Sequence, residues 1–465
     1  MVFSSLIFLF LYLPAVLLIY YIVPPRGRNV FLLIANLVFY GWGEPVFVLI
    51  MAASVVSNFI FGLLIDKYRD NKRLSKTFVI FALAVSFGLL GAFKYAGFFA
   101  DILRQIPLLS MLPKIKLSLP IGISFYTFQA VSYIIDVYRN DTPAQKSIVN
   151  FGTYISFFPQ LIAGPIVRYA DIREQLENRR ESINQFADGI RVFTVGLAKK
   201  VLIANQMGLF WESVKDCGND MGTLGAWIGI AAYTLQIYFD FSGYSDMAVG
   251  LGRMFGFEFM RNFNYPYVSE SITDFWRRWH ISLSSWFRDY VYIPLGGNRR
   301  KTPRVIFNLF VVWALTGFWH GASFNFIFWG VYYFVLLVLE KYVYGKYLER
   351  LPSAFRHIYA LFFVMIGWVI FTFESGSEML DYFRLMFTPG NGVIGGAALS
   401  ASLSYLPLGA AAVIACTPLG KNVWCKIKST RVCGAAEIVL CAAALVICTA
   451  ALVSDSYNPF LYFRF

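Results

Sequence analysis

Apolar runs of about twenty residues recur along the whole chain, separated by short polar loops. Each run is long enough to cross about 30 Å of hydrocarbon as a helix. The pattern therefore predicts an all-α polytopic membrane protein with about twelve spans. The expected spans are Ser4 to Val23, Asn29 to Gly41, Val46 to Ile65, Phe78 to Phe99, Ser118 to Val137, Ile190 to Trp211, Leu224 to Gly250, Val305 to His320, Phe324 to Val343, Ile358 to Phe373, Leu403 to Ala415 and Ile438 to Val453.

Basic residues gather in alternate loops, and this sets the expected orientation. The loop DKYRDNKRLSK from Asp66 carries five bases, and KNVWCKIKSTR from Lys421 is also basic. Loops of this kind stay on the cytoplasmic side. Both termini are then expected outside the cytoplasm. The first run lacks a basic leader and a small-residue cleavage site, so it is interpreted as a retained span.

Three stretches do not fit a straight span. FGTYISFFPQLIAGPIVRY is apolar but contains Pro159, Gly164 and Pro165, which favours a broken or re-entrant helix. IREQLENRRESINQ is expected to be an amphipathic helix on the cytoplasmic side. ESITDFWRRWH is too charged to span, and Ser271 with Asp274 fits an N-terminal helix cap.

Composition agrees with a membrane protein. The chain is 58% hydrophobic and 14% charged, with a net charge of +13 placed mostly in loops, and no nucleic-acid module is visible. Its six cysteines show no metal-type spacing, so neither disulfides nor a metal site is expected. No internal repeat divides the sequence. We therefore expect one integral-membrane domain over 1–465, with a core motif region at 151–330 and an outer tail at 454–465.

Candidate chemistry centres on two of the three histidines, His280 and His320, each of which follows a tryptophan. Histidine suits proton transfer near neutral pH, and an apolar site favours the neutral imidazole that accepts a proton. Glycines flank His320 where backbones approach closely or a narrow substrate passes. His280 lies four residues after Trp276, which would put both on one helical face. No hydrolase elbow, metalloprotease motif or phosphate loop is present.

Ionisable residues within apolar runs are functional candidates by default. Here, however, we expect four of them to be mainly structural, since a buried carboxylate needs a cationic partner. These are Asp240, Asp246, Arg277 and Arg278, with Arg253 as a further candidate partner.

Four long motifs resemble one family. WRRWHISLSSWFRDYVYIPLGGNR, TGFWHG, FDFSGYSDMAVGLGRMFGF and FPQLIAGPIVRY are similar to the membrane-bound O-acyltransferases, in the branch that O-acetylates alginate and peptidoglycan. The resemblance implies a ring of spans around a thinned centre, with His320 catalytic and His280 as a second polar residue. Within the same motifs we expect substrate-binding residues at Trp319, Trp276, Asn298 and Gln160.

The resemblance also implies substrates and partners. The acyl donor would be a cytosolic thioester, most simply acetyl-CoA used as a substrate, and no cofactor is expected. The acceptor would be a hydroxyl of an exported polysaccharide, reached directly or through an extracytoplasmic acetyltransferase partner. The protein would lie among the lipids of a bacterial inner membrane.

The tail SDSYNPFLYFRF looks like the C-terminal motif of the small peptide that accompanies the D-alanyl-teichoic-acid system. That likeness implies a possible acyl-carrying role for Tyr462. An interfacial anchor explains the aromatic residues equally well.

Three alternatives stay open at the level of the sequence. The chain could transfer D-alanyl groups to teichoic acid, because that related transferase shares the WHG histidine. It could be a proton-coupled transporter that uses the intramembrane aspartates and histidines. It could also be a scaffold that recruits a secreted transferase.

Overall fold

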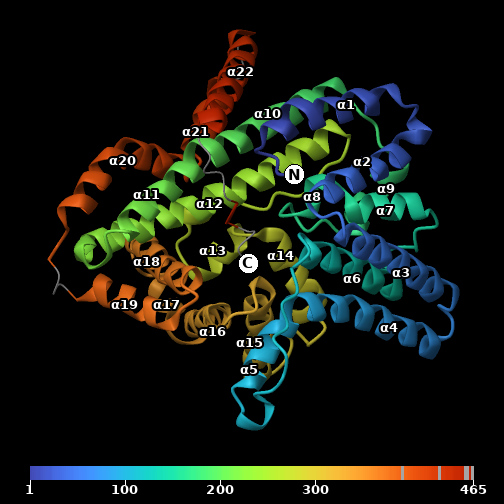
Figure 1. Ribbon diagram of the computed structural model, residues 1–465, viewed down its shortest axis with the longest axis horizontal. Coiled ribbons are helices and arrows are strands. Elements are labelled where there is room, and N and C mark those ends of the chain that lie inside the picture. The colour runs from blue at the N-terminus through green and yellow to red at the C-terminus, as the bar shows by residue number, and fades with distance from the viewer. Residues whose placement is uncertain (389–391, 428–430, 455–459, 462–465) are drawn as a thin grey trace. The chain divides into compact units, whose positions relative to one another are not determined.

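The computed structural model describes residues 1–388, 392–427, 431–454 and 460–461, and across these residues the regular structure is entirely helical (Figure 1). The all-α prediction is confirmed. Several α-helices are continued or preceded by short π-helical segments, which are frequent near functional sites. These segments are η1 (Phe8–Tyr12), η3 (Gly91–Tyr95), η5 (Lys199–Ala204), η8 (Arg288–Tyr292) and η9 (Glu340–Tyr344).

Seven helical stretches in the described part of the chain are long and apolar enough to cross a membrane: Phe47–Lys67, Lys72–Arg104, Thr302–His320, Phe324–Leu348, Ser353–Thr372, Gly396–Ala415 and Gly434–Ser454. This supports the polytopic class, while the count of about twelve stays a prediction. Some of the other expected spans form shorter helices. The run expected to end at Val23 gives an apolar helix over Phe8–Ile22. The run expected from Ser118 gives α6 (Ile123–Arg139), which is buried around most of its circumference.

Two compact units can be distinguished. Unit 1 comprises Met1–Phe193 with Ser245–Met260, and unit 2 comprises Thr194–Tyr244 with Arg261–Phe465. The sequence indicates no such boundary, and two of the three points where the units divide lie within helices, α10 and α12.

Unit 1 contains the N-terminal helices. They are α1 (Leu13–Ile22), α2 (Arg28–Gly43), α3 (Phe47–Lys67), α4 (Lys72–Leu90), α5 (Ala96–Arg104), α6 (Ile123–Arg139), α7 (Ile148–Ser156), α8 (Phe158–Leu161), α9 (Tyr169–Asn178) and most of α10 (Ile183–Ala198). α3, α4 and α6 lie side by side (Figure 1). Gly62 permits the close contact of α3 with α6, since a Cβ there would lie 2.4 Å from the Tyr133 hydroxyl.

Two of the segments predicted not to form a straight span are interrupted, one as expected and one against expectation. The apolar Pro-containing segment is interrupted at Phe157, where α7 ends and α8 begins with Pro159 in its first turn, so the broken helix is confirmed. The hydrophilic run predicted as one amphipathic helix is instead divided between α9 and α10. The helix ends because Arg179 adopts an extended backbone, which frees its side chain to join a polar network.

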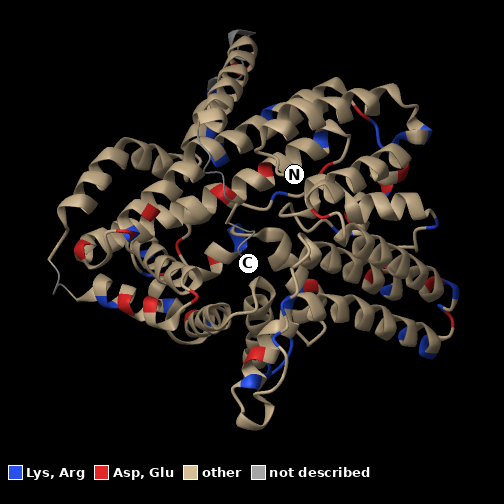
Figure 2. Ribbon diagram, in the orientation of Figure 1, with Lys and Arg blue, Asp and Glu red and all other residues tan. Residues whose placement is uncertain are grey.

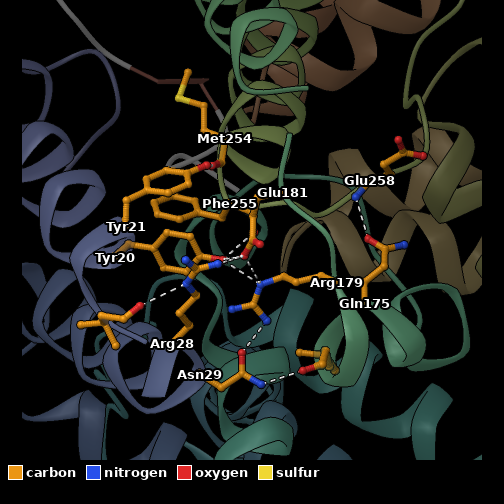
Figure 3. A network of polar contacts seen from close by, with 12 residues as sticks. Tyr20, Tyr21, Arg28, Asn29, Gln175, Arg179, Glu181, Met254, Phe255 and Glu258 are labelled. Atoms are coloured by element: carbon orange, nitrogen blue, oxygen red, sulfur yellow. Dashed lines mark hydrogen bonds and ion pairs between the residues drawn. The ribbon is translucent and has the colours of Figure 1, made fainter. Parts of the chain in front are cut away.

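That network joins the linker between α9 and α10 to residues of α1 and α2 (Figure 3). Glu181 pairs with Arg28 at 2.8 Å and accepts a hydrogen bond from the Tyr20 hydroxyl at 2.5 Å, while Arg179 donates to Tyr20 and, at 2.6 Å, to Asn29. Burial tends to raise the pKa of Glu181, but the bonds from Tyr20 and Arg28 outweigh it and leave that pKa below its usual value. The network therefore fastens the α9–α10 linker to the junction of α1 and α2.

Unit 2 holds the remaining helices. They are α11 (Asn205–Lys215), the first part of α12 (Gly222–Met254), α13 (Ile272–Arg278), α14 (Ile281–Phe287), α15 (Thr302–His320), α16 (Phe324–Leu339), α17 (Gly345–Leu348), α18 (Ser353–Thr372), α19 (Gly376–Phe387), α20 (Gly396–Ala415), α21 (Leu419–Ile427) and α22 (Arg431–Ser454). Figure 2 shows that Lys, Arg, Asp and Glu lie mainly toward the helix ends and in the loops of each unit. Long uncharged helix bodies are typical of segments that face lipid.

Candidate active site

His320 is the last residue of α15, and close packing against α16 fixes its position. Gly317 lies where the two helices touch, since a Cβ there would come within 2.3 Å of the Phe326 carbonyl oxygen. Gly330 on α16 faces the Trp313 carbonyl oxygen in the same way, at 2.5 Å. Of the two roles the sequence allowed for glycine beside His320, close approach of backbones is the one observed.

The His320 side chain lines a cavity in unit 2. The walls are mostly aromatic and come from α12, α16, α18, the α13–α14 corner and the end of the chain. The lining residues are Ile237, Asp240, Phe241, Trp279, His320, Trp329, Trp368, Phe371, Phe460 and Leu461. Trp329 and Phe371 meet the imidazole edge to face at centroid distances of 5.0 and 5.3 Å. His320 is 8% exposed, so reacting groups there would be shielded from bulk water.

His280 is placed by a corner of the chain rather than by a helix. α13 ends at Arg278, and His280 adopts a left-handed backbone (φ 44°) before α14 begins. The prediction that Trp276 and His280 share a helical face is therefore wrong, because the helix stops between them. A left-handed conformation is uncommon outside glycine and is found often at functional sites.

Asn262 determines which nitrogen of His280 carries the proton. Its side-chain oxygen accepts the Ser282 backbone N–H at 3.1 Å and lies 3.2 Å from His280 Nδ1. A backbone N–H only donates, so the shared atom is an oxygen, and Nδ1 must donate to it as well. Nε2 is left as the acceptor nitrogen. Burial lowers the pKa of His280 to about 3, so the ring is neutral at physiological pH.

Trp319 connects the two histidines. Its indole ring lies edge to face with His280 at a centroid distance of 5.9 Å and with His320 at 5.1 Å. Trp276 packs instead against Trp313, Trp329 and Tyr333. His280 and His320, forty residues apart in the sequence, therefore belong to one aromatic cluster. Trp319 stands behind both rings, and Trp276 lies behind the cavity wall.

The predicted structural ions have different partners from those expected. Asp240 pairs with Lys200 at 2.6 Å, and both side chains are 3% exposed. Arg278 pairs with Asp274, and Arg253 pairs with Asp188. The expectation that an arginine near in sequence would neutralise Asp240 is therefore wrong, because Lys200 of η5 lies closer in space. Asp246 is half-buried on the part of α12 that belongs to unit 1, and Arg277 is exposed.

Two further candidates, Asn298 and Gln160, do not line the cavity. Asn298 is exposed in a turn, where it accepts hydrogen bonds from Tyr292 and Lys341. Gln160 is buried in unit 1 and donates to the Tyr154 carbonyl oxygen at 2.6 Å. Tyr462 lies outside the described residues. The described part of the chain contains no cluster of three or more His, Cys, Asp or Glu side chains able to hold a metal.

Sequence reasoning did not single out Lys200, Asn262 or the aromatic wall formed by Trp368 and Phe371. One signal was available for Lys200, because it interrupts an expected span and ionisable residues in spans are functional candidates. Asn262 and Phe371 carry no comparable signal, because their roles depend on contacts with distant segments.

Comparison with known proteins gives consistent matches. The family described as MBOAT, membrane-bound O-acyltransferase family, matches residues 139–377. The probable alginate O-acetylase AlgI of Pseudomonas aeruginosa is 45% identical over 393 residues, which is 84% of this chain and 75% of that protein. The peptidoglycan O-acetyltransferase of Helicobacter pylori is 33% identical over 423 residues, covering 83% and 80%. The teichoic acid D-alanyltransferase of Bacillus subtilis is 29% identical over 272 residues, covering 54% and 68%.

Proposed function

The chain belongs to the membrane-bound O-acyltransferase family, and from this premise we propose that it moves an acetyl group from a cytosolic thioester to a hydroxyl of an exported polysaccharide. The protein is a multi-pass membrane acyltransferase. Relatives named for O-acetylation of alginate and peptidoglycan cover more than four-fifths of this chain, whereas the D-alanyltransferase covers 54%. Acetyl transfer is therefore favoured over D-alanyl transfer.

The observation that carries the proposal is the placement of His320 in a buried, aromatic-walled cavity. A neutral imidazole there takes the proton from the acceptor hydroxyl as its oxygen attacks the thioester carbonyl carbon. The new C–O bond forms, the C–S bond breaks, and the proton passes from the imidazole to the departing thiolate. His280 takes no proton in this scheme. Neutral and fixed by Asn262, it acts with Trp319 to orient the reacting ring.

We place the protein in a bacterial cytoplasmic membrane with both termini extracytoplasmic. The thioester, acetyl-CoA, then enters from the cytoplasm, and an extracytoplasmic acetyltransferase passes the acetyl group to the polymer.

In this scheme Tyr462 is the first acceptor. Its hydroxyl displaces the thiol, and the acetyl-tyrosine then donates to a partner serine or to the polymer. A phenol leaves more readily than an alkyl alcohol, so the second transfer runs downhill.

The test compares wild-type protein with His320→Ala, and uses His357→Ala as the matched control because that half-exposed histidine lies outside the cavity. Purified protein in lipid nanodiscs receives radiolabelled acetyl-CoA or a D-alanyl carrier protein, and free thiol release is measured. In cells, base-released acetate from the polysaccharide is measured. General-base catalysis typically contributes about 10²–10⁴-fold. His320→Ala should therefore lose transfer at unchanged expression, while His357→Ala keeps it.

The outcomes separate the alternatives. Activity above about a tenth of wild type in His320→Ala would remove the histidine from its assigned role. Thiol release only from the D-alanyl carrier protein would favour the other transfer, and no thiol release by wild type would favour a transporter or scaffold. Tyr462→Phe keeps an aromatic anchor and removes only the oxygen. Normal acetylation by that variant would show that the tail serves only as an anchor.

A further inference from the structure

The described end of the chain forms part of the cavity wall. Phe460 and Leu461 are 4% and 5% exposed, and both line the cavity beside His320. The Phe460 ring stacks on Tyr244 of α12, with centroids 4.7 Å apart and an interplanar angle of 27°. Two residues from the terminal segment are therefore buried inside unit 2.

A buried ion pair holds this segment. The Leu461 backbone N–H donates to Asp240 Oδ2 at 2.8 Å, while the other Asp240 oxygen lies 2.6 Å from Lys200 Nζ. The Lys200 ammonium also lies 6.0 Å from the centre of the Phe460 ring, within range of a cation–π contact. One carboxylate thus joins two interactions, one to Lys200 of η5 and one to the chain's own end.

An ion pair as buried as this one is a poor source of stability by itself. Attraction between the charges repays their desolvation only where further hydrogen bonds satisfy the remaining lone pairs. The Leu461 N–H supplies such a bond to the second Asp240 oxygen. The ion pair and the docked segment therefore stabilise each other. The role of this buried pair beside the cavity is then to hold the docked segment.

We propose that Lys200 and Asp240 are positioning residues that form an internal receptor for the C-terminal segment and complete the wall of the His320 cavity by holding Phe460 and Leu461 in place. The docking itself is independent of the proposed function. Its effect on acetyl transfer rests on that function, so the two are measured separately.

The first measurement follows docking through hydrogen exchange of the C-terminal peptide in full-length protein. The Leu461 amide should be protected in wild type, because its hydrogen bond lies in a buried site. Single charge removal leaves an unpaired buried ion, so the informative variant is Lys200→Met with Asp240→Leu, which removes both charges together. In that double variant the amide should exchange at least about tenfold faster. Lys199→Met, at the neighbouring lysine, is the control and should keep the protection.

The second measurement uses the donor at Leu461. Leu461→Pro removes the N–H and retains the chain length, whereas Leu461→Ala shortens the side chain and keeps the N–H. Acetyl transfer should fall at least about tenfold in Leu461→Pro and in the Lys200→Met/Asp240→Leu variant, and much less in Leu461→Ala. Combining the two changes should add no further loss, because residues that act through one contact are not additive.

Three results would overturn the proposal: unchanged amide protection in the double variant, additive losses in the combined variant, or a gain of activity on undocking. The last result would show that the segment blocks the cavity. Absence of transfer by the wild type, with the amide still protected, would instead count against the proposed function and leave the docking intact.

Discussion

At the scale of single residues, His320 is held by the packing of α15 against α16, and His280 is held by a corner of the chain and by Asn262. Both lie beside tryptophans in apolar sequence, and that unusual setting is visible without a structure. The left-handed backbone at His280 was not predictable, because WRRWH continues a helical pattern and the helix ends only through contacts with residues 262 and 264. Asn262 lies 18 residues away, and nothing local indicates that it fixes the ring.

Replacement of Asn262 by leucine tests this arrangement. Asn262→Leu is close to isosteric and leaves three buried donors, the Ser282 N–H, the Ser282 hydroxyl and His280 Nδ1–H, without their acceptor. An unsatisfied buried group costs about 1–3 kcal/mol. The variant should melt at a lower temperature and lose most of its acetyl transfer. Asn264→Leu, the same change at an exposed position two residues along, is the control. Equal behaviour of the two variants would show that Asn262 does not hold His280.

At the scale of elements, the capping of α13 shows how far local patterns reach. The sequence placed an N-terminal cap at Ser271, and this is confirmed, since its hydroxyl oxygen accepts the Asp274 N–H at 3.0 Å. The first two N–H groups of the helix donate elsewhere. Ile272 and Thr273 donate to the carboxylate of Glu340 at 2.8 and 2.9 Å. Glu340 lies in η9, 68 residues away from Ile272, so no local signal announces it.

Glu340 is therefore expected to hold the helix that leads to His280. Glu340→Ala leaves two N–H groups without an acceptor at the positive end of a helix, where loss of a cap costs about 1–2 kcal/mol. The melting temperature and the transfer rate should both fall, and Glu340→Gln, which keeps one acceptor oxygen, should be intermediate. The exposed Glu349 provides the matched control as Glu349→Ala. A melting temperature of Glu340→Ala equal to that of the control would contradict the role.

At the scale of the whole molecule, the apolar runs and basic loops were enough to predict an all-α membrane protein. The length of an apolar run is a local property, so it can be measured from the sequence without knowledge of tertiary contacts. The cavity depends on residues as distant as Asp240 and Leu461, 221 positions apart, and periodicity does not encode such pairs. The count of about twelve spans stays a prediction, because only seven helical stretches of the described residues are long and apolar enough to cross alone, while others, such as α6, are shorter and largely buried.

The orientation of the chain in the membrane decides from which side the thioester enters. The candidate span Lys72–Arg104 separates the basic turn at Asp70 from the loop at Ser110, and both residues are exposed. Positive residues stay in the cytoplasm. In spheroplasts, a membrane-impermeant maleimide should therefore label Ser110→Cys directly and Asp70→Cys only after permeabilisation. The exposed native Cys425, which lies in α21 within the second basic segment, should behave like Asp70→Cys and serves as the internal control. The reverse labelling pattern would place the basic turn outside the cytoplasm. The distribution of basic loops would then no longer support entry of the thioester from the cytoplasm.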